Sequence, residues 1–195
     1  MLSTWTVMVS KRCALILTNP KLRLIKTQKL FDGCVIKAKI SYDEQLNFTA
    51  ICVYAPASAE DNLIFWKKVR SLKSHGLVIL FGDVNTVIDP RYDIFGGIKN
   101  PRPGAKAYKG ALNNLNLKDA LLSKVNLLEN MTFVIKCKKL KSKAGSRLDV
   151  FAVSKDYSQY FSQPEVHSCL LSDHKPVSFY FDLAPPHLPK EALIH

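Results

Sequence analysis

Two short polar motifs in this sequence carry residue types that handle protons and phosphate oxygens. The first is Gly82-Asp83-Val84-Asn85, which directly follows the apolar run of residues 77–81. An aspartate there can bind a hard cation or orient a water, and an asparagine amide can donate to a phosphate oxygen. Taken alone, the motif is more typical of an Asx turn that ends a strand.

The second motif is Ser172-Asp173-His174, in a polar turn between two apolar segments. A carboxylate beside an imidazole suits proton transfer near neutral pH. A single histidine in a polar turn is more often simply solvated. Neither motif by itself therefore decides between catalysis and a surface turn.

Two further motifs stand at the ends of predicted strands. Residues 146–149, Ser-Arg-Leu-Asp, open a strand, and the period of two puts Arg147 and Asp149 on one face. Tyr54 closes another strand and leaves a phenol at its end. The structural alternatives are a cross-strand ion pair for the first motif and a packing tyrosine for the second.

The elements that must position these residues are mostly strands. Short apolar or alternating runs predict strands at residues 14–18, 34–40, 47–54, 77–81, 131–135, 148–153, 166–171 and 177–181. Ser58, with Asp61 three residues on, predicts the start of a helix. A short helix is also expected within 107–117. The pattern favours an α/β sandwich of layered sheets over a Rossmann sheet.

Three segments are expected to be loops or ends. Residues 89–104 hold several prolines and glycines and predict a long loop. Residues 136–147 predict a basic hairpin loop, and a solvated lysine-rich turn explains it about as well as a DNA contact. We expect one domain over residues 1–183 and a Pro-rich tail over 184–195.

The bulk composition bounds the class of protein. A length of 195 residues suggests one domain, and 28 Lys and Arg against 16 Asp and Glu give a net charge of +12. That charge favours a polyanionic partner, although a soluble basic protein would look the same. The five cysteines form no CxxC pair, which favours reduced thiols. The sequence lacks a membrane-spanning run and a secretory signal, so we expect an intracellular protein, with the nucleus as a fitting location.

Five motifs occur in a fixed order: Tyr-Ala-Pro, Gly-Asp-x-Asn-Thr, Thr-Phe, Ser-Arg-Leu-Asp and Ser-Asp-His-x-Pro-Val. Over residues 14–181 the chain thereby resembles the endonuclease/exonuclease/phosphatase superfamily, which includes DNase I and apurinic endonucleases. It looks most similar to the endonuclease domain of non-LTR (LINE-type) retrotransposons. Inositol phosphatases of the superfamily carry Trp-Cys-Asp-Arg in place of Ser-Arg-Leu-Asp, which argues against a lipid substrate.

The resemblance implies a DNase I-like four-layer α/β sandwich and metal-dependent hydrolysis of phosphodiesters, as a DNA-nicking endonuclease using Mg²⁺ or Mn²⁺. By resemblance, Asp83 activates or orients the attacking water and Asn85 helps to hold the phosphate. His174, oriented by Asp149, binds the scissile phosphate or transfers a proton, and Tyr54 contacts a phosphate oxygen. Such groups stabilise the charge that develops on the phosphate oxygens.

The resemblance also implies a metal site and a DNA-binding surface. Asp173 would lie beside the metal. The residues expected to contact DNA are Thr132, Ser172, Ser146, Arg147, Lys138, Lys139 and Lys141. DNA is the expected partner, with no membrane and no small organic cofactor. We expect a monomer, or one part of a larger polyprotein that includes a reverse transcriptase.

The chain departs from the family pattern at its start. The family's first strand carries an asparagine motif, and a metal-binding glutamate follows a helix and a second strand; neither motif is present. The first acidic residue is Asp32. We therefore expect a domain that lacks its first strand or strands and a helix, with an exposed sheet edge and apolar surface.

Loss of the main metal ligand predicts little or no nuclease activity for the chain. Three alternatives remain open at this point: a remnant that binds nucleic acid without cleaving it, a fragment that folds poorly, and a small-molecule phosphatase of the same superfamily.

Overall fold

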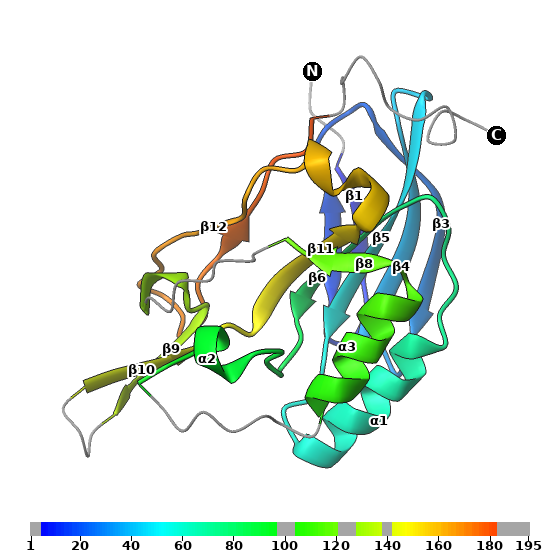
Figure 1. Ribbon diagram of the computed structural model, residues 1–195. Coiled ribbons are helices and arrows are strands. Elements are labelled where there is room, and N and C mark those ends of the chain that lie inside the picture. The colour runs from blue at the N-terminus through cyan, green and yellow to red at the C-terminus, as the bar shows by residue number, and fades with distance from the viewer. Residues whose placement is uncertain (1–4, 97–103, 121–127, 138–141, 183–195) are drawn as a thin grey trace.

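The computed structural model describes residues 5–96, 104–120, 128–137 and 142–182. Its centre is a six-stranded sheet in the order β3-β4-β5-β6-β11-β8 (Figure 1). The strands are β3 (Leu22–Leu30), β4 (Val35–Tyr42), β5 (Leu46–Tyr54), β6 (Leu77–Asp83), β11 (Asp149–Ser154) and β8 (Leu117–Asp119). Only β5 and β6 pair in parallel, and this register sets Tyr54 beside Asp83 at the ends of both strands.

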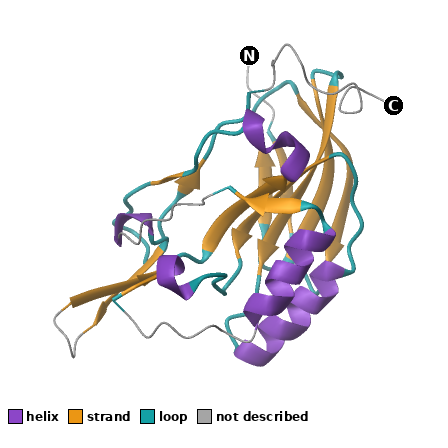
Figure 2. Cartoon of the chain, viewed as in Figure 1, coloured by secondary structure: helices purple, strands orange, loops and turns teal. Residues whose placement is uncertain are grey.

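Two helices, α1 (Ala59–Arg70) and α3 (Gly104–Asn114), lie side by side against one face of this sheet (Figure 2). The predicted cap of α1 is confirmed, because the Ser58 side chain accepts a hydrogen bond from the backbone N–H of Asp61. Trp66 and Val69 of α1 are fully buried between the helices and the sheet. These helices bury one face of the apolar run that became β6, and the layer described next covers its other face.

The opposite face of the sheet is covered by two small antiparallel sheets. The hairpin β1 (Thr6–Val9) and β2 (Ala14–Leu17) packs Met8 and Leu15 against the β4 and β5 core. The pair β12 (Glu165–Val166) and β13 (Val177–Ser178) lies before Phe179, whose ring centroid is 4.1 Å from that of Phe151 on β11. Helices, main sheet and small sheets thus form three layers.

A further small sheet, in the order β7-β10-β9, projects from the end of the main sheet (Figure 1). It consists of β7 (Ile94–Phe95), β10 (Ser142–Ser146) and β9 (Phe133–Cys137), with the short helix α2 (Pro90–Asp93) just before β7. Two 3-10 turns, η1 (Leu128–Asn130) and η2 (Lys155–Tyr160), complete the described elements. A hairpin is present, but the prediction was wrong in detail, because β10 lies within the expected loop and pairs with β9, whereas β11 pairs with β6 and β8. Lys138, Lys139 and Lys141 lie outside the described residues, as does the tail 184–195.

The predicted α/β sandwich of layered sheets is confirmed, although the described elements form three layers where four were expected. Other details differ as well. The strand β3 was not predicted, because most of its residues are exposed and polar and show no apolar period. The predicted strands at 166–171 and 177–181 shrink to two residues each. The expected exposed apolar surface is present on β1 and β2, where Val7, Val9 and Ile16 are 53%, 55% and 48% exposed. No helix in the described ranges is long and apolar enough to cross a membrane.

Candidate active site at the edge of the main sheet

Asp83 and Asn85 form a tight turn at the end of β6. The backbone N–H of Asn85 donates to Asp83 Oδ1 at 2.9 Å, and its amide Nδ2 donates to Asp83 Oδ2 at 2.9 Å. The same amide donates to the Ala55 carbonyl at 2.8 Å. Gly82 has φ of +122°, and a Cβ there would collide with the Val53 carbonyl oxygen. A glycine is therefore required for β5 to approach this closely.

His174 lies across from this turn and is held by Asp149. His174 Nδ1 and Asp149 Oδ2 are 2.8 Å apart, and the two side chains are 34% and 23% exposed. Asp149 is the first residue of β11 and pairs directly with Asp83 of β6. Because Nδ1 is engaged, His174 presents Nε2 as its free ring nitrogen. Residues far apart in the sequence thus form one cluster of two carboxylates and an imidazole.

The environment of Asp83 raises its pKa to about 6. Burial is the main cause, because it disfavours the charged carboxylate, and the nearby charge of Asp149 acts in the same direction. The hydrogen bonds from Asn85 and the field of His174 oppose the shift. A carboxylate with this pKa is deprotonated at neutral pH, yet it is a stronger base than an ordinary aspartate.

Solved structures share this architecture. The chain matches the endonuclease domain of TRAS1, a telomere-specific non-LTR retrotransposon, with a TM-score of 0.65 and 18% identity over 93% of this chain and 81% of that one. An AP endonuclease from Archaeoglobus fulgidus matches with a TM-score of 0.71 and 17% identity over 92% and 80%. A 3′ phosphatase from Neisseria, bound to product DNA hairpin, matches with 0.68 and 17% over 91% and 79%. No protein-family model matches the sequence, and no curated protein matches it significantly.

The chain has the DNase I-like fold. The resemblance drawn from the five motifs is thereby confirmed at the level of the fold. At identities of 17 to 18%, the comparison establishes the architecture alone.

In this DNase I-like fold, Thr132 is a positioning residue, which corrects the expected contact with DNA. Its side chain is fully buried, and its Oγ1 accepts from the backbone N–H groups of Leu148 and Asp149, both at 2.9 Å. Its carbonyl accepts from the backbone N–H of Lys175 at 2.6 Å. Thr132 therefore ties the start of β11 to the segment that carries His174.

Arg147 is also corrected from a DNA contact to a buried ion pair. Its side chain is 9% exposed, with Nη2 at 2.8 Å from Asp93 Oδ1 and Nη1 at 2.9 Å from Asp119 Oδ2. The guanidinium is therefore turned away from solvent. The ion pair was the structural alternative raised by the sequence, but neither partner was foreseen, since they lie 54 and 28 residues away.

The remaining predicted residues lie around the same edge. Ser172 is exposed, and its Oγ accepts from the backbone N–H of His174 at 3.0 Å. Asp173 is exposed, and its carbonyl accepts from the backbone N–H of Val134. Ser146 ends β10 and pairs with Phe133 and Ile94. None of these observations tests their predicted roles toward DNA or metal.

The described residues do not fit a resident metal ion. Over the described ranges, no group of three His, Cys, Asp or Glu side chains is placed to hold one. Both carboxylate oxygens of Asp83 accept hydrogen bonds from Asn85, and Asp149 Oδ2 is engaged by His174. Three of the four carboxylate oxygens of Asp83 and Asp149 are therefore engaged within the protein.

Two features near the site were not anticipated. Asn62 of α1 is 2% exposed, and its amide donates to the carbonyls of Pro56 and Val84, which fixes the turns after β5 and β6. The sequence does not reveal this role of Asn62, because a polar residue is ordinary at a position within a helix. Beside Tyr54 lies a cavity of about 480 Å³, where the Arg12 guanidinium sits 5.7 Å from the centre of the Tyr54 ring.

Proposed function

We propose that this chain acts on phosphodiester bonds of DNA, as a DNA-nicking endonuclease of retrotransposon origin, with the weak activity expected without the family's metal-binding glutamate. The observation that carries the proposal is the cluster at the sheet edge, in which Asp149 orients His174 opposite Asp83. That arrangement unites a base and an oriented imidazole at one point, within a fold shared with nucleases.

The residues of the chain divide the proton chemistry between them. Asp83, with a pKa of about 6, accepts a proton from the attacking water at neutral pH. His174 directs Nε2 toward the scissile phosphate and donates a hydrogen bond or a proton to its oxygens. Asp149 holds the imidazole in the orientation this requires and stabilises its charged form.

Asn85 takes a different part from the one expected. Its amide hydrogens go to Asp83 and to the Ala55 carbonyl, so its role in the proposal is to orient the base. Tyr54, 36% exposed and level with Asp83, remains available to contact a phosphate oxygen.

The structural neighbours support DNA as the substrate class. They are a retrotransposon endonuclease domain, an AP endonuclease and a phosphatase bound to a DNA hairpin. Retrotransposon origin rests on the first of them. The net charge of +12 fits a polyanionic substrate, because it attracts phosphate without reading sequence.

The direct test is nicking of supercoiled plasmid by the whole chain with Mg²⁺ or Mn²⁺. Asp83→Ala and His174→Ala should each abolish the relaxed product. Asp43→Ala and His75→Ala are matched controls, because both residues are exposed and remote from the cluster. Nicking that persists in both Asp83→Ala and His174→Ala would contradict the proposal.

A second function is favoured by the poor fit to a metal ion. With no described group of three ligands, the chain can bind DNA without cleaving it. This alternative predicts salt-sensitive DNA binding that Asp83→Ala leaves unchanged, together with no nicking in either metal. Hydrolysis of p-nitrophenyl phosphate without nicking would instead indicate a small-molecule phosphatase.

A further inference from the structure

Seven exposed or half-exposed cations lie on two neighbouring strands of the main sheet, on the two long helices and just after α1. We call them the cationic strip: Lys26, Lys37, Lys39, Arg70, Lys73, Lys106 and Lys109. They come from β3, β4, α1, the segment after α1, and α3. None of them belongs to the candidate active site.

The sheet part of the strip is continuous with the helix part. Lys26 pairs with Lys39 across β3 and β4, and Lys37 lies two residues before Lys39 on the same face. Lys37 also pairs with Ile51, which belongs to the helix-side core, so this face turns toward the helices. Lys37 Nζ donates to the carbonyl of Lys73, just beyond the end of α1. Partial burial, aided by the charge of Lys26, lowers the pKa of Lys37.

The helix part surrounds a shallow basic depression. A cavity of about 520 Å³ between the ends of α1 and α3 is lined by Arg70, Lys106, Lys109, Gly110, Asn113 and Asn114. Asn114 Nδ2 donates to the Arg70 carbonyl at 2.8 Å, which fixes one helix against the other. The lining contains three cations and two amides but no carboxylate. Such a set of donors is suited to phosphate oxygens.

The charges of the strip differ from those of some other exposed cations. Lys21 pairs with Asp43, and Arg23 pairs with Glu44. In the part of the chain that the structure describes, no residue of the strip forms an ion pair.

The dipole of α1 favours cations in its last turn and accounts for Arg70. It does not account for Lys106 and Lys109, because no basic residue occupies the last turn of α3. A solvated helix face alone therefore does not explain why these lysines gather beside Arg70.

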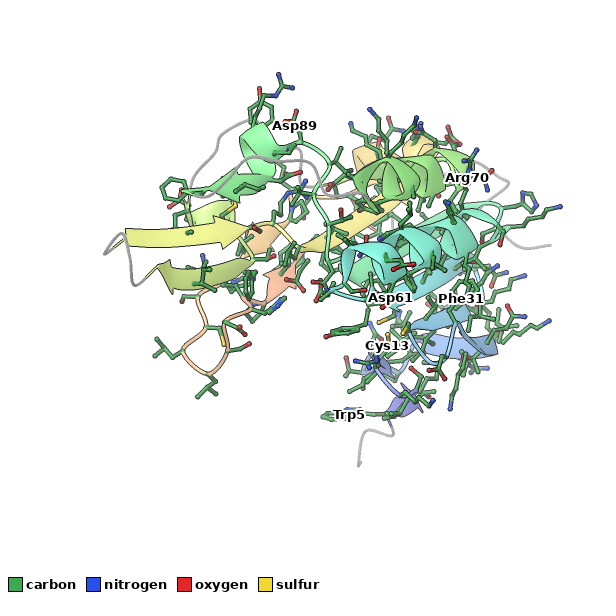
Figure 3. All side chains as sticks on the ribbon, turned by 90° about the horizontal axis from the view of Figure 1, so that it is seen from below. Trp5, Cys13, Phe31, Asp61, Arg70 and Asp89 are labelled. Atoms are coloured by element: carbon green, nitrogen blue, oxygen red, sulfur yellow. The ribbon has the colours of Figure 1, made fainter. Side chains whose placement is uncertain are left out.

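The Arg70 end of the strip is separated from the catalytic edge. Asn62, near the start of α1, contacts the turn that carries Asp83 and Asn85, whereas Arg70 ends the helix. Figure 3 shows this separation, with Asp61 at the end of α1 beside Phe31 and Cys13, and Arg70 at the other end. At about 1.5 Å per residue, the axis from Asn62 to Arg70 spans roughly 12 Å. This exceeds the screening length of about 8 Å at physiological salt.

We propose that the cationic strip binds the phosphodiester backbone of a second nucleic-acid segment, independently of the segment at the catalytic edge. Ammonium and guanidinium groups of the strip neutralise phosphates, and the amides of Asn113 and Asn114 add neutral donors. Binding of this kind releases counterions and carries no base sequence preference.

The test compares two triple variants of the whole chain with equal loss of charge. The strip variant is Arg70→Gln, Lys106→Gln and Lys109→Gln; the control is Lys21→Gln, Arg23→Gln and Lys155→Gln. Anisotropy of a labelled 30-base-pair duplex is measured in EDTA at several salt concentrations. The slope of log affinity against log salt should fall by about 2 to 3 for the strip variant, since each phosphate contact contributes about 0.9. The control should change far less.

A labelled single-stranded RNA forms the second arm. Loss of RNA binding in the strip variant, with duplex binding intact, would identify the backbone as RNA; loss of duplex binding would identify it as DNA. Equal losses in the strip and control variants, or none in either arm, would overturn the proposal. Both variants change exposed side chains, and their unfolding transitions should match the parent chain. Asp83→Ala should leave the salt slope unchanged, so failure of the hydrolase proposal and failure of this one give different results.

Discussion

Arg147 and Asp149 stand two residues apart at the start of β11, yet they belong to clusters of opposite character. Arg147 is 9% exposed and lies between two carboxylates at 2.8 and 2.9 Å. Asp149 is 23% exposed and belongs to a cluster with Asp83 and a histidine that is 34% exposed. The first cluster is closed to water, and the second opens at the rim of the sheet.

The difference between the clusters shows how similar residue types come to have different roles. In the closed cluster, the carboxylates of Asp93 and Asp119 offset the cost of burying the guanidinium, and the group is locked in its charged form. In the open cluster, two carboxylates face each other with a single imidazole, and the pKa of Asp83 rises. The closed cluster is suited to holding the fold, and the open one to moving protons.

The largest expected effect is on the open cluster, through Asp149→Asn. The amide can no longer stabilise a charged imidazole, so nicking should fall by about a thousandfold. Stability should change little, because Asp149 is partly solvated. Plasmid relaxation rates and urea unfolding measure the two effects. Asp156→Asn, at an exposed position beyond β11, is the control. An unaltered nicking rate in Asp149→Asn would contradict a catalytic role of the open cluster.

The closed cluster should respond in stability. Arg147→Met leaves two buried carboxylates without their cation, and the free energy of unfolding should drop by about 3 to 5 kcal/mol. Arg91→Met breaks an exposed pair with Asp89 and should lower the free energy of unfolding far less, because solvent screens exposed ion pairs. Urea denaturation followed by circular dichroism compares them. Similar losses for both variants would show that burial of Arg147 is of no energetic consequence.

A smaller effect concerns the pH dependence of stability. Asp83 has a pKa of about 6 in the folded protein and an ordinary value when unfolded, so the folded state holds this proton more tightly. Stability should therefore fall as pH rises from about 4 to about 6, by on the order of 1 kcal/mol after solvent screening. Asp83→Asn should flatten this part of the profile. A parent profile that rises in this window relative to Asp83→Asn would contradict the assignment.

The smallest effect is expected at Tyr54. Tyr54→Phe keeps the ring beneath Arg12 and removes only the hydroxyl, so nicking should fall by about two- to tenfold with stability unchanged. Tyr42→Phe, whose ring faces Lys21 elsewhere on the sheet, is a matched control. A loss as large as that of Asp149→Asn would place Tyr54 in the open cluster itself.

Much of this organisation follows from the sequence alone. The apolar run before Gly82 predicts the buried strand β6, and Ser58 with Asp61 predicts the start of α1, because both signals are local. The order of five motifs predicts the DNase I-like fold and brings Asp83, Asp149 and His174 into one hypothesis.

Other properties were decided only by the tertiary structure. The partners of Arg147 and the burial of Thr132 depend on contacts between segments that are distant in the sequence. No local sequence pattern predicts such long-range contacts. The pKa of Asp83 arises from burial and from Asp149 across the β6–β11 pair. Sequence determined which groups are present, and folding decided which are sealed from water and which remain free to react, because desolvation and charge pairing act through space.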